Sequence, residues 1–396
     1  MRKTLVFVAV VSVAAGVALT GCSSLPLIGG GGTGLHQALG RIAATDATRK
    51  WVTYDATGKL TRLVGKQLGG SGFGLLLLDG TDLGPMAQLL PGDTGIAALD
   101  ADYGVSAGLP PDTVSVLAGG QHADQIGKAL TGSGWTRSGD RYVGPDVTAV
   151  TDDSKVQYAL NLAQVRTDGA DVIFGKAKAD LGAAGHPGSS LADDQPTAAL
   201  ADCLGDVVAA QLSADFHSPI ESSRLTPAQR AALAKQRPAG IQLDKLREVA
   251  VGVRTPKSTS DTPRAVVCVA WADQSAADGY AAALPGVLSA GTSLASNQPY
   301  ARLLHNPQTR KVGGGAHIVQ WSADEGGGPG RSSACWRCRT CPGSSDPGTR
   351  QEVGHAGDER RGNARVPRVR HPYREDLHSR RRRAPARGAR VVRPRR

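Results

Sequence analysis

Apolar residues recur in short runs between glycine-rich and polar turns from about residue 35 to residue 325. In the first half of this stretch most runs favour β structure, because β-branched and aromatic residues fit a pleated, half-buried surface. The pattern changes near 122–135, where Ile126, Ala129 and Leu130 follow helical spacing before two glycines. We therefore predict one helix at 122–135, and strands at 113–118, 141–150, 156–165 and 171–175.

The second half of the chain also mixes helices and strands. The clearest helix lies at 225–240, where Thr226 suits the cap, Pro227 the first turn, and Pro238 with Gly240 the end. We predict further helices at 197–205 and at 274–284, the second of which ends at Pro285. Strands are predicted at 248–255, 264–271 and 315–323, and the first two form a hairpin with a polar connection.

Both halves contain a strand, a helix that begins near an Ala-Asp-Gln tripeptide (Ala123–Gln125 and Ala272–Gln274), and a later strand. This pattern indicates either a diverged internal duplication or a coincidence in an alanine-rich chain. Strands and helices that mix without strict alternation favour the α+β class. We predict two sheet-plus-helix domains, 35–180 and 197–325, joined by a linker of small and polar residues at 181–196.

The chain begins with a pattern typical of a secretory signal. Arg2 and Lys3 precede an apolar stretch from Leu5 to Leu19, which is shorter than the roughly 20 residues that a membrane-spanning helix needs. The end of this stretch, Leu-Thr-Gly-Cys at residues 19–22, resembles the lipobox of bacterial lipoproteins.

The resemblance implies that the chain is cut before Cys22, that a diacylglyceryl group is attached to the thiol, and that the new amino terminus is acylated, for example with palmitate. Two or more acyl chains anchor a protein stably, whereas one holds it only marginally. We expect residues 1–21 to be the lipoprotein signal peptide. The mature protein is then lipid-anchored at the extracytoplasmic face of the cell membrane. The alternative is an ordinary cleaved signal in which Cys22 has no role.

Residues 22–34 follow as a glycine-rich segment, which suits a flexible tether between the lipid and the body. Gly29, Gly31 and Gly34 have the spacing of a dinucleotide-binding GxGxxG motif. Such a motif needs a preceding strand and a surrounding βαβ unit, and neither is predicted here.

Residues 326–396 differ in composition from the rest of the chain. They carry 19 arginines, no lysine and 6 acidic residues, so their net charge is +13 and that of the preceding residues is −2. Leucine, isoleucine, valine and phenylalanine make up 6 of these 71 residues, a composition typical of disorder. Codons for arginine, proline, glycine and alanine are GC-rich, so one hypothesis is a frameshift near codon 326 in a GC-rich bacterial gene. The other is a genuine basic tail that binds anionic lipid or nucleic acid.

Cys335, Cys338 and Cys341 lie within this segment at CxxCxxC spacing, which could supply three ligands to zinc or an iron–sulfur cluster. A fourth ligand is lacking nearby, since the next candidate is His355. We therefore expect no metal site here.

Cys203 and Cys268 are the only thiols between residue 35 and residue 325. An exported protein meets an oxidising environment, where a pair of cysteines usually forms a bridge. We predict a Cys203–Cys268 disulfide; the alternative is two buried free cysteines.

Motifs of common hydrolase and nucleotide-binding sites are absent from the sequence, including GxSxG, SxxK, HExxH and the P-loop. The "DADYG" segment resembles part of a calcium loop but lacks its later ligands, and the other acidic clusters are typical of turns. We expect no cofactor, no metal and no catalytic residue among the scattered histidines and these acidic residues: His36, His122, His186, His217, His305 and His317; Asp79, Asp82, Asp100, Asp102, Asp152 and Asp153.

These observations predict a membrane-anchored, non-enzymatic lipoprotein that binds a small molecule, a lipid or a protein partner in the cell envelope. An envelope hydrolase with a site assembled from dispersed residues is the alternative, because members of a catalytic triad need not be neighbours in sequence. A third reading is a protein that binds anionic polymers through its basic tail, although the nearly neutral body argues against nucleic acid as the partner.

Overall fold

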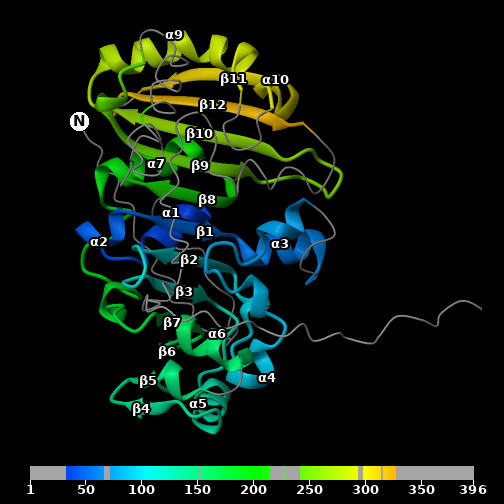
Figure 1. Cartoon of the computed structure of the whole chain (residues 1–396), viewed down its shortest axis with the longest axis vertical. Helices are drawn as coiled ribbons and strands as arrows, with labels where there is room; N and C mark the ends of the chain where they lie inside the picture. The colour runs from blue at the N-terminus through cyan, green and yellow to red at the C-terminus, as the bar shows by residue number, and fades with distance from the viewer. Residues whose placement is uncertain are drawn as a thin grey trace, which may run out of the picture. The chain divides into compact units, whose positions relative to one another are not determined.

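The computed structural model describes residues 33–66, 72–150, 153–214, 227, 241–292, 298–313 and 315–326. These residues form helices and one antiparallel sheet of twelve strands, in the order β11-β12-β10-β9-β8-β1-β2-β3-β7-β6-β5-β4 (Figure 1). The expected α+β class is therefore observed in its coarse form, as a mixture of helices with a large antiparallel sheet.

The first part of the chain supplies strands β1 to β7 and helices α1 to α6. The strands are β1 Val52–Asp55, β2 Tyr103–Ala107, β3 Val114–Ala118, β4 Thr136–Ser138, β5 Arg141–Val143, β6 Gln164–Asp168 and β7 Asp171–Gly175. The helices are α1 Gly34–Leu39, α2 Asp46–Arg49, α3 Thr57–Val64, α4 Leu90–Thr94, α5 Ala123–Gly132 and α6 Asp153–Asn161.

The second part supplies the remaining strands and helices. The strands are β8 Val207–Ser213, β9 Leu246–Arg254, β10 Arg264–Trp271, β11 Leu304–Val312 and β12 Ile318–Glu325. The helices are α7 Gln195–Leu204, α9 Gln274–Ala290 and α10 Tyr300–Leu303. Among all the described helices, none is long and apolar enough to cross a bilayer.

The topology of the sheet repeats about its centre. Outward from the middle, the strand order is β1-β2-β3-β7-β6 in one direction and β8-β9-β10-β12-β11 in the other. In both halves a helix, α5 or α9, connects the third strand to the next strands of the sheet. The central strands β1 and β8 pair antiparallel, as strands related by a two-fold axis through the sheet would do. The first repeat adds the β4–β5 hairpin outside β6.

This repeated topology favours an internal duplication, but the two Ala-Asp-Gln tripeptides are not equivalent in it. Asp273 is the N-cap of α9 and accepts a hydrogen bond from the Ala276 amide at 2.9 Å. Asp124 instead lies inside the first turn of α5, whose N-cap position holds His122. The repeat is therefore visible in strand order, whereas the sequence similarity that suggested it falls at different helix positions.

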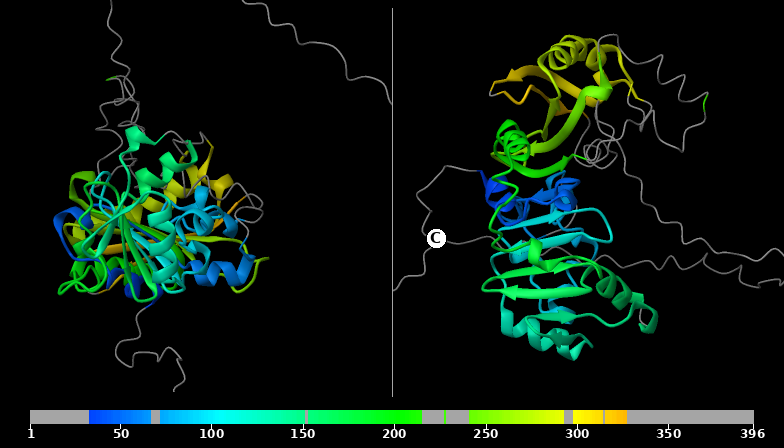
Figure 2. Two further views of the ribbon diagram at one scale, coloured as in Figure 1. Left: turned by 90° about the horizontal axis from the view of Figure 1, so that it is seen from below. Right: turned by 90° about the vertical axis from the view of Figure 1, so that its left-hand side faces the viewer.

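The segment 181–196, which we expected to be a linker, lies between the two repeats and packs against the first. Leu181 and Leu191 are buried, and isolated bridges join Ile42 to Ala184 and Ala43 to Ser190. The sheet continues through the β1–β8 pair (Figures 1 and 2), so the two halves share one sheet.

The sheet has two covered faces. On the face that we call the α7 face, one row of paired positions is almost wholly apolar or small: Cys268, Ala250, Leu212, Val52, Ala107, Val114 and Gly175. On the opposite α9 face, the row begins with Trp321, Val267 and Val251, becomes polar at Gln211, Thr53, Ser106 and Ser115, and ends with Phe174 and Val165. The α9 face therefore carries two separate apolar clusters, one under α5 and one under α9.

Several predicted elements are confirmed by the structure. The expected helices at 122–135 and 197–205 correspond to α5 and α7, and the expected hairpin is the β9–β10 pair. The strands expected at 113–118, 171–175 and 315–323 correspond to β3, β7 and β12. The helix expected at 225–240 falls almost entirely outside the described residues.

Three predictions were wrong in part. The strand expected at 141–150 is limited to β5, Arg141–Val143, and residues 147–149 form a short 3-10 helix instead. Residues 156–161 belong to helix α6, since Tyr158 and Leu162 are four residues apart and both are buried; only Gln164 onward forms a strand. Helix α9 does not end before Pro285 but continues to Ala290. Pro285 occupies an exposed position of α9.

Candidate functional site

Helix α7 covers one face of the sheet, and polar and charged groups lie at its two ends. Asp194 caps its first turn by accepting from the Thr197 amide, Pro196 lies in that turn, and Gly205 ends the helix with a φ of 68°. Leu200 and Leu204 are buried, and the helix packs against β9, β10 and β12. This packing holds the helix in place on strands β9, β10 and β12.

The predicted disulfide is present in the structure and fastens α7 to the sheet. Cys203 near the end of α7 is joined to Cys268 of β10, and both residues are buried. The buried amide of Gln320 donates a hydrogen bond to the backbone carbonyl of Cys203 and lies 4.0 Å from the sulfur of Cys268. The alternative of two free thiols is not what the structure contains.

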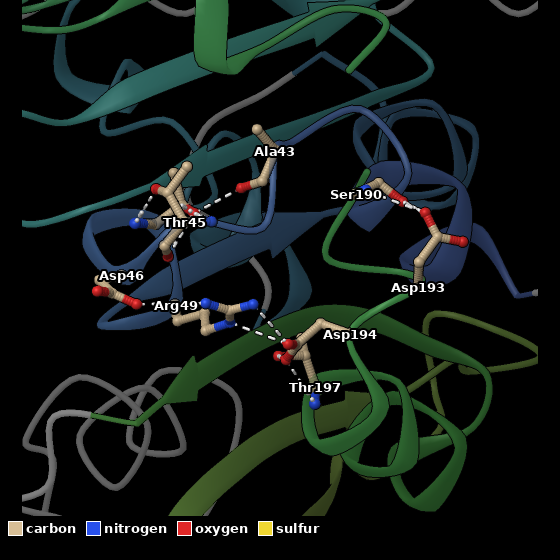
Figure 3. Close-up of polar contacts among 9 residues, drawn as sticks. Ala43, Thr45, Asp46, Arg49, Ser190, Asp193, Asp194 and Thr197 are labelled. Atoms are coloured by element: carbon tan, nitrogen blue, oxygen red, sulfur yellow. Dashed lines mark hydrogen bonds and ion pairs between the residues drawn. The ribbon is translucent and has the colours of Figure 1, made fainter. Parts of the chain in front are cut away.

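The first turn of α7 is tied to α2. Arg49 donates from Nε to Asp194 Oδ1 at 2.9 Å, and Asp194 Oδ2 accepts from the Thr197 hydroxyl at 2.7 Å. Figure 3 shows Arg49 between Asp194 on one side and Asp46 on the other. This contact joins the first repeat to the second.

The connection between the repeats is fixed by further local bonds. Thr45 and Thr48 form a capping box at the start of α2, and the Thr48 hydroxyl donates to the carbonyl of Ala43 at 2.6 Å. Asp193 accepts from both the amide and the hydroxyl of Ser190, at 3.0 and 2.7 Å (Figure 3). These bonds satisfy backbone and hydroxyl groups within this part of the chain.

Glu248 of β9 faces the same end of α7. Burial raises its pKa to about 7, and the charge of Asp194 acts in the same direction, whereas Arg49 lowers it. A neutral carboxyl is therefore substantially populated at this position near neutral pH.

The other end of α7 is basic. Arg254 of β9, Arg264 of β10 and Arg310 of β11 lie around it, and the charges of Arg264 and Arg310 both act on Arg254. Positive charge near a helix C-terminus is favourable, because the helix macrodipole places about half a negative charge there. Two of these arginines occupy partly buried positions on the sheet.

A buried carboxyl lies at the end of β1. Asp55 is fully buried, accepts from the Thr57 hydroxyl at 2.5 Å and from the Gly80 amide at 2.9 Å, and fixes the turn that contains Gly80. Burial raises the pKa of Asp55 to about 7, although these hydrogen bonds act in the opposite direction. Two tight backbone approaches, at Gly80 and Gly104, close the space around it.

Beside α9 and β11, nine residues that include Pro285, Leu288, His305 and Pro307 line an open groove of about 450 Å³. No lysine, arginine or carboxylate lines it. The groove therefore offers little to select a charged ligand.

The other residues singled out in the sequence are dispersed. His36 bonds Asp202 at 2.8 Å, His186 lies 3.6 Å from Asp168, His317 bonds Gln274 at 3.2 Å, and Asp100 pairs with Lys66. Within the described ranges, no three histidine, cysteine or acidic residues come together as metal ligands. Cys22, Gly29 and Gly31, Asp152, His217 and the CxxCxxC cluster fall outside the described residues.

Comparisons with protein-family models, with curated proteins and with solved structures find no match to this chain.

The sequence reasoning missed the arginines around α7, Glu248 and Asp55. Arg254 and Arg264 flank the connection of the predicted hairpin, so their proximity could have been inferred from the hairpin itself. The position of Arg310 near the end of α7 could not have been inferred, because strand β11 was not predicted.

Proposed function

We propose that this protein is an exported lipoprotein, anchored by acylated Cys22 at the extracytoplasmic face of the cell membrane, whose body binds a ligand or partner without catalysing a reaction. The observation that carries the proposal is the order of the first 22 residues: basic start, apolar stretch of signal-peptide length, and Leu-Thr-Gly-Cys. The glycine-rich composition of the residues up to Gly34, where α1 begins, suits a tether between the lipid and the body.

The disulfide supports export. Disulfides persist in oxidising compartments and are rare in reducing ones, and Cys203–Cys268 is buried where it holds α7 to the sheet. The signal would thus deliver the protein to an oxidising compartment, in which this disulfide persists.

The anchor is tested by growing cells with an alkyne-labelled fatty acid and reading the label on the purified full chain. Wild type is expected to carry label, and Cys22→Ser is expected to carry none, because the hydroxyl cannot form the thioether. Cys338→Ser is the matched control and keeps the label, since it makes the same chemical change elsewhere. Equal labelling of the wild type and Cys22→Ser, or no label on either, contradicts the proposal.

A further inference from the structure

Three arginines from three strands gather at the C-terminal end of α7, on the α7 face. The ladder pairs Val253 with Ala265, and the next residues are Arg254 at the end of β9 and Arg264 at the start of β10, whose charge acts on Arg254. Like charges that lie close together on paired strands are destabilising. This pair of positions needs a compensating negative charge.

Arg264 has its own partners. It donates to Asp324 at 2.5 Å and to the Ser322 hydroxyl at 3.0 Å, both on the neighbouring strand β12. Asp324 also accepts from Asn306 at 2.9 Å. The negative charge of Asp324 is therefore committed to Arg264.

Arg310 reaches inward from the edge strand β11. Its Nε donates to Gln320 Oε1 at 2.5 Å, and the amide of the same Gln320 donates to the Cys203 carbonyl at the end of α7. The side chain of Arg310 is thus directed across β12 toward the helix end. Among the described residues, no carboxylate forms an ion pair with Arg310.

Arg254 is partly buried against Gly205, the residue that ends α7. Burial and the charges of Arg310 and Arg264 lower the pKa of Arg254 from its ordinary value. Among the described residues, Asp206 is the acid whose charge acts on Arg254 in the other direction, and Asp206 is itself paired with Lys59 at 2.7 Å. No ion pair to Arg254 occurs within the part of the chain that the structure describes.

The balance of charge at this place is positive. Among the described residues, four cations, Lys59, Arg254, Arg264 and Arg310, are set against two carboxylates, Asp206 and Asp324; Asp202 in the last turn of α7 is bonded to His36. The macrodipole of α7 supplies only about half a negative charge at its end. More than one positive charge remains uncompensated beside a partly desolvated guanidinium group.

We propose that Arg254, Arg264 and Arg310 bind a phosphate-bearing anion at the C-terminal end of α7. Guanidinium groups present paired N–H donors that match the oxygens of a phosphate, and several of them around one anion make charge-assisted hydrogen bonds. This proposal rests on the proposed ligand-binding function and specifies the class of ligand, a phosphate-bearing anion. The phosphate is either a free ion or the headgroup of an anionic phospholipid.

The test is the thermal unfolding of the full chain in sodium phosphate against sodium chloride of equal ionic strength. An anion that binds the folded body and not the unfolded chain raises Tm, whereas binding that is equal in the folded and the unfolded chain leaves Tm unchanged. We expect phosphate to raise the Tm of wild type by about 2 °C or more. The rise should be lost in Arg254→Gln and in Arg310→Gln.

Arg247→Gln is the matched control, because it removes the same charge from the exposed part of the same strand. It should keep the full rise. In chloride, Arg254→Gln should be at least as stable as the wild type, since the change relieves repulsion by Arg264. Arg310 is exposed, so Arg310→Gln tests the site with a variant that is expected to fold. An equal rise in all four proteins, or a rise in none, overturns the proposal.

Short-chain phosphatidylglycerol and phosphatidylcholine, added below their micelle concentrations, separate the two sources. A larger rise with phosphatidylglycerol than with phosphate, lost in Arg254→Gln, assigns the site to a lipid headgroup. An equal or larger rise with phosphate assigns it to the free ion. A rise with phosphatidylcholine alone overturns the proposal, because it would not follow net negative charge. Failure here leaves the Cys22 labelling result unaffected, so the two proposals fail separately.

Discussion

Replacing both Cys203 and Cys268 by alanine is expected to lower the free energy of unfolding by about 4 kcal/mol. The disulfide closes a loop of 65 positions, and the chain-entropy model gives this magnitude for that length. The loss of two buried sulfur atoms from the packing between α7 and β10 acts in the same direction. The measurement is urea unfolding of the full chain, with exposed thiols blocked.

The reduced wild type is the natural comparison for this double variant. Reducing agent is expected to move the unfolding midpoint of the wild type close to that of Cys203→Ala/Cys268→Ala, and to leave the variant where it is. A double variant whose stability is within about 1 kcal/mol of the oxidised wild type would show that α7 is held by its apolar contacts alone.

The stability of the protein is expected to fall as the pH rises from about 5 to about 8, by on the order of 2 kcal/mol from Asp55 alone. Asp55 has a pKa raised from its ordinary value of 3.8 to about 7 in the folded protein. Between these values the folded state keeps a proton that the unfolded state has released. The stabilising contribution is therefore complete at low pH, declines from about pH 4, and is lost once the pH passes about 7.

Asp55→Asn separates this effect from the others. The amide cannot ionise, so the variant should lose the share of the pH dependence that Asp55 supplies. At about pH 5 it should also be less stable than wild type by roughly 1–3 kcal/mol, because its NH₂ group would face either the Thr57 hydroxyl or the Gly80 amide, which are both donors to Asp55.

Two further variants control the pH experiment. Glu248→Gln should remove a further part of the fall in stability with rising pH, because the pKa of Glu248 is also raised to about 7. Asp124→Asn changes an exposed aspartate in α5 and should leave the slope as it is in wild type. Urea midpoints across this pH range give the slopes, and a wild type that becomes more stable between about pH 5 and pH 8 would contradict the assignment.

The parts of the fold that could be predicted are those whose pattern is local. The β9–β10 hairpin was readable because both strands are runs of valine and alanine around one polar connection. Helix α5 was readable from the spacing of Ile126 and Leu130 and from the glycine that ends it. Local sequence decides such elements before any distant partner is known.

The centre of the sheet could not be read in this way. β1 has only four residues, and its partners in β2 and β8 lie about 50 and 160 positions away in the chain. The edge strand β11 escaped prediction because its residues from His305 to Lys311 are all exposed and, apart from Pro307, polar, so they show no buried alternation. The arginines around α7 come together only through this long-range order, and for that reason the candidate site was not visible in the sequence.

The boundary at residue 326, by contrast, followed from composition and coincides with a structural limit. β12 ends at Glu325, and β12 occupies the place in the second repeat that β7 occupies in the first. All five strands that the two repeats share are therefore formed before the arginine-rich segment begins.

The central claim is that a lipid attached to Cys22 anchors this body at the outer face of a membrane. The mass of the mature protein tests this claim most directly. The protein is extracted from membranes in detergent and its N-terminal peptide is measured. The account predicts a chain that begins at Cys22 and carries the added mass of a diacylglyceryl group. A mature chain whose Cys22 has no added mass, or one cut at another residue, would contradict it.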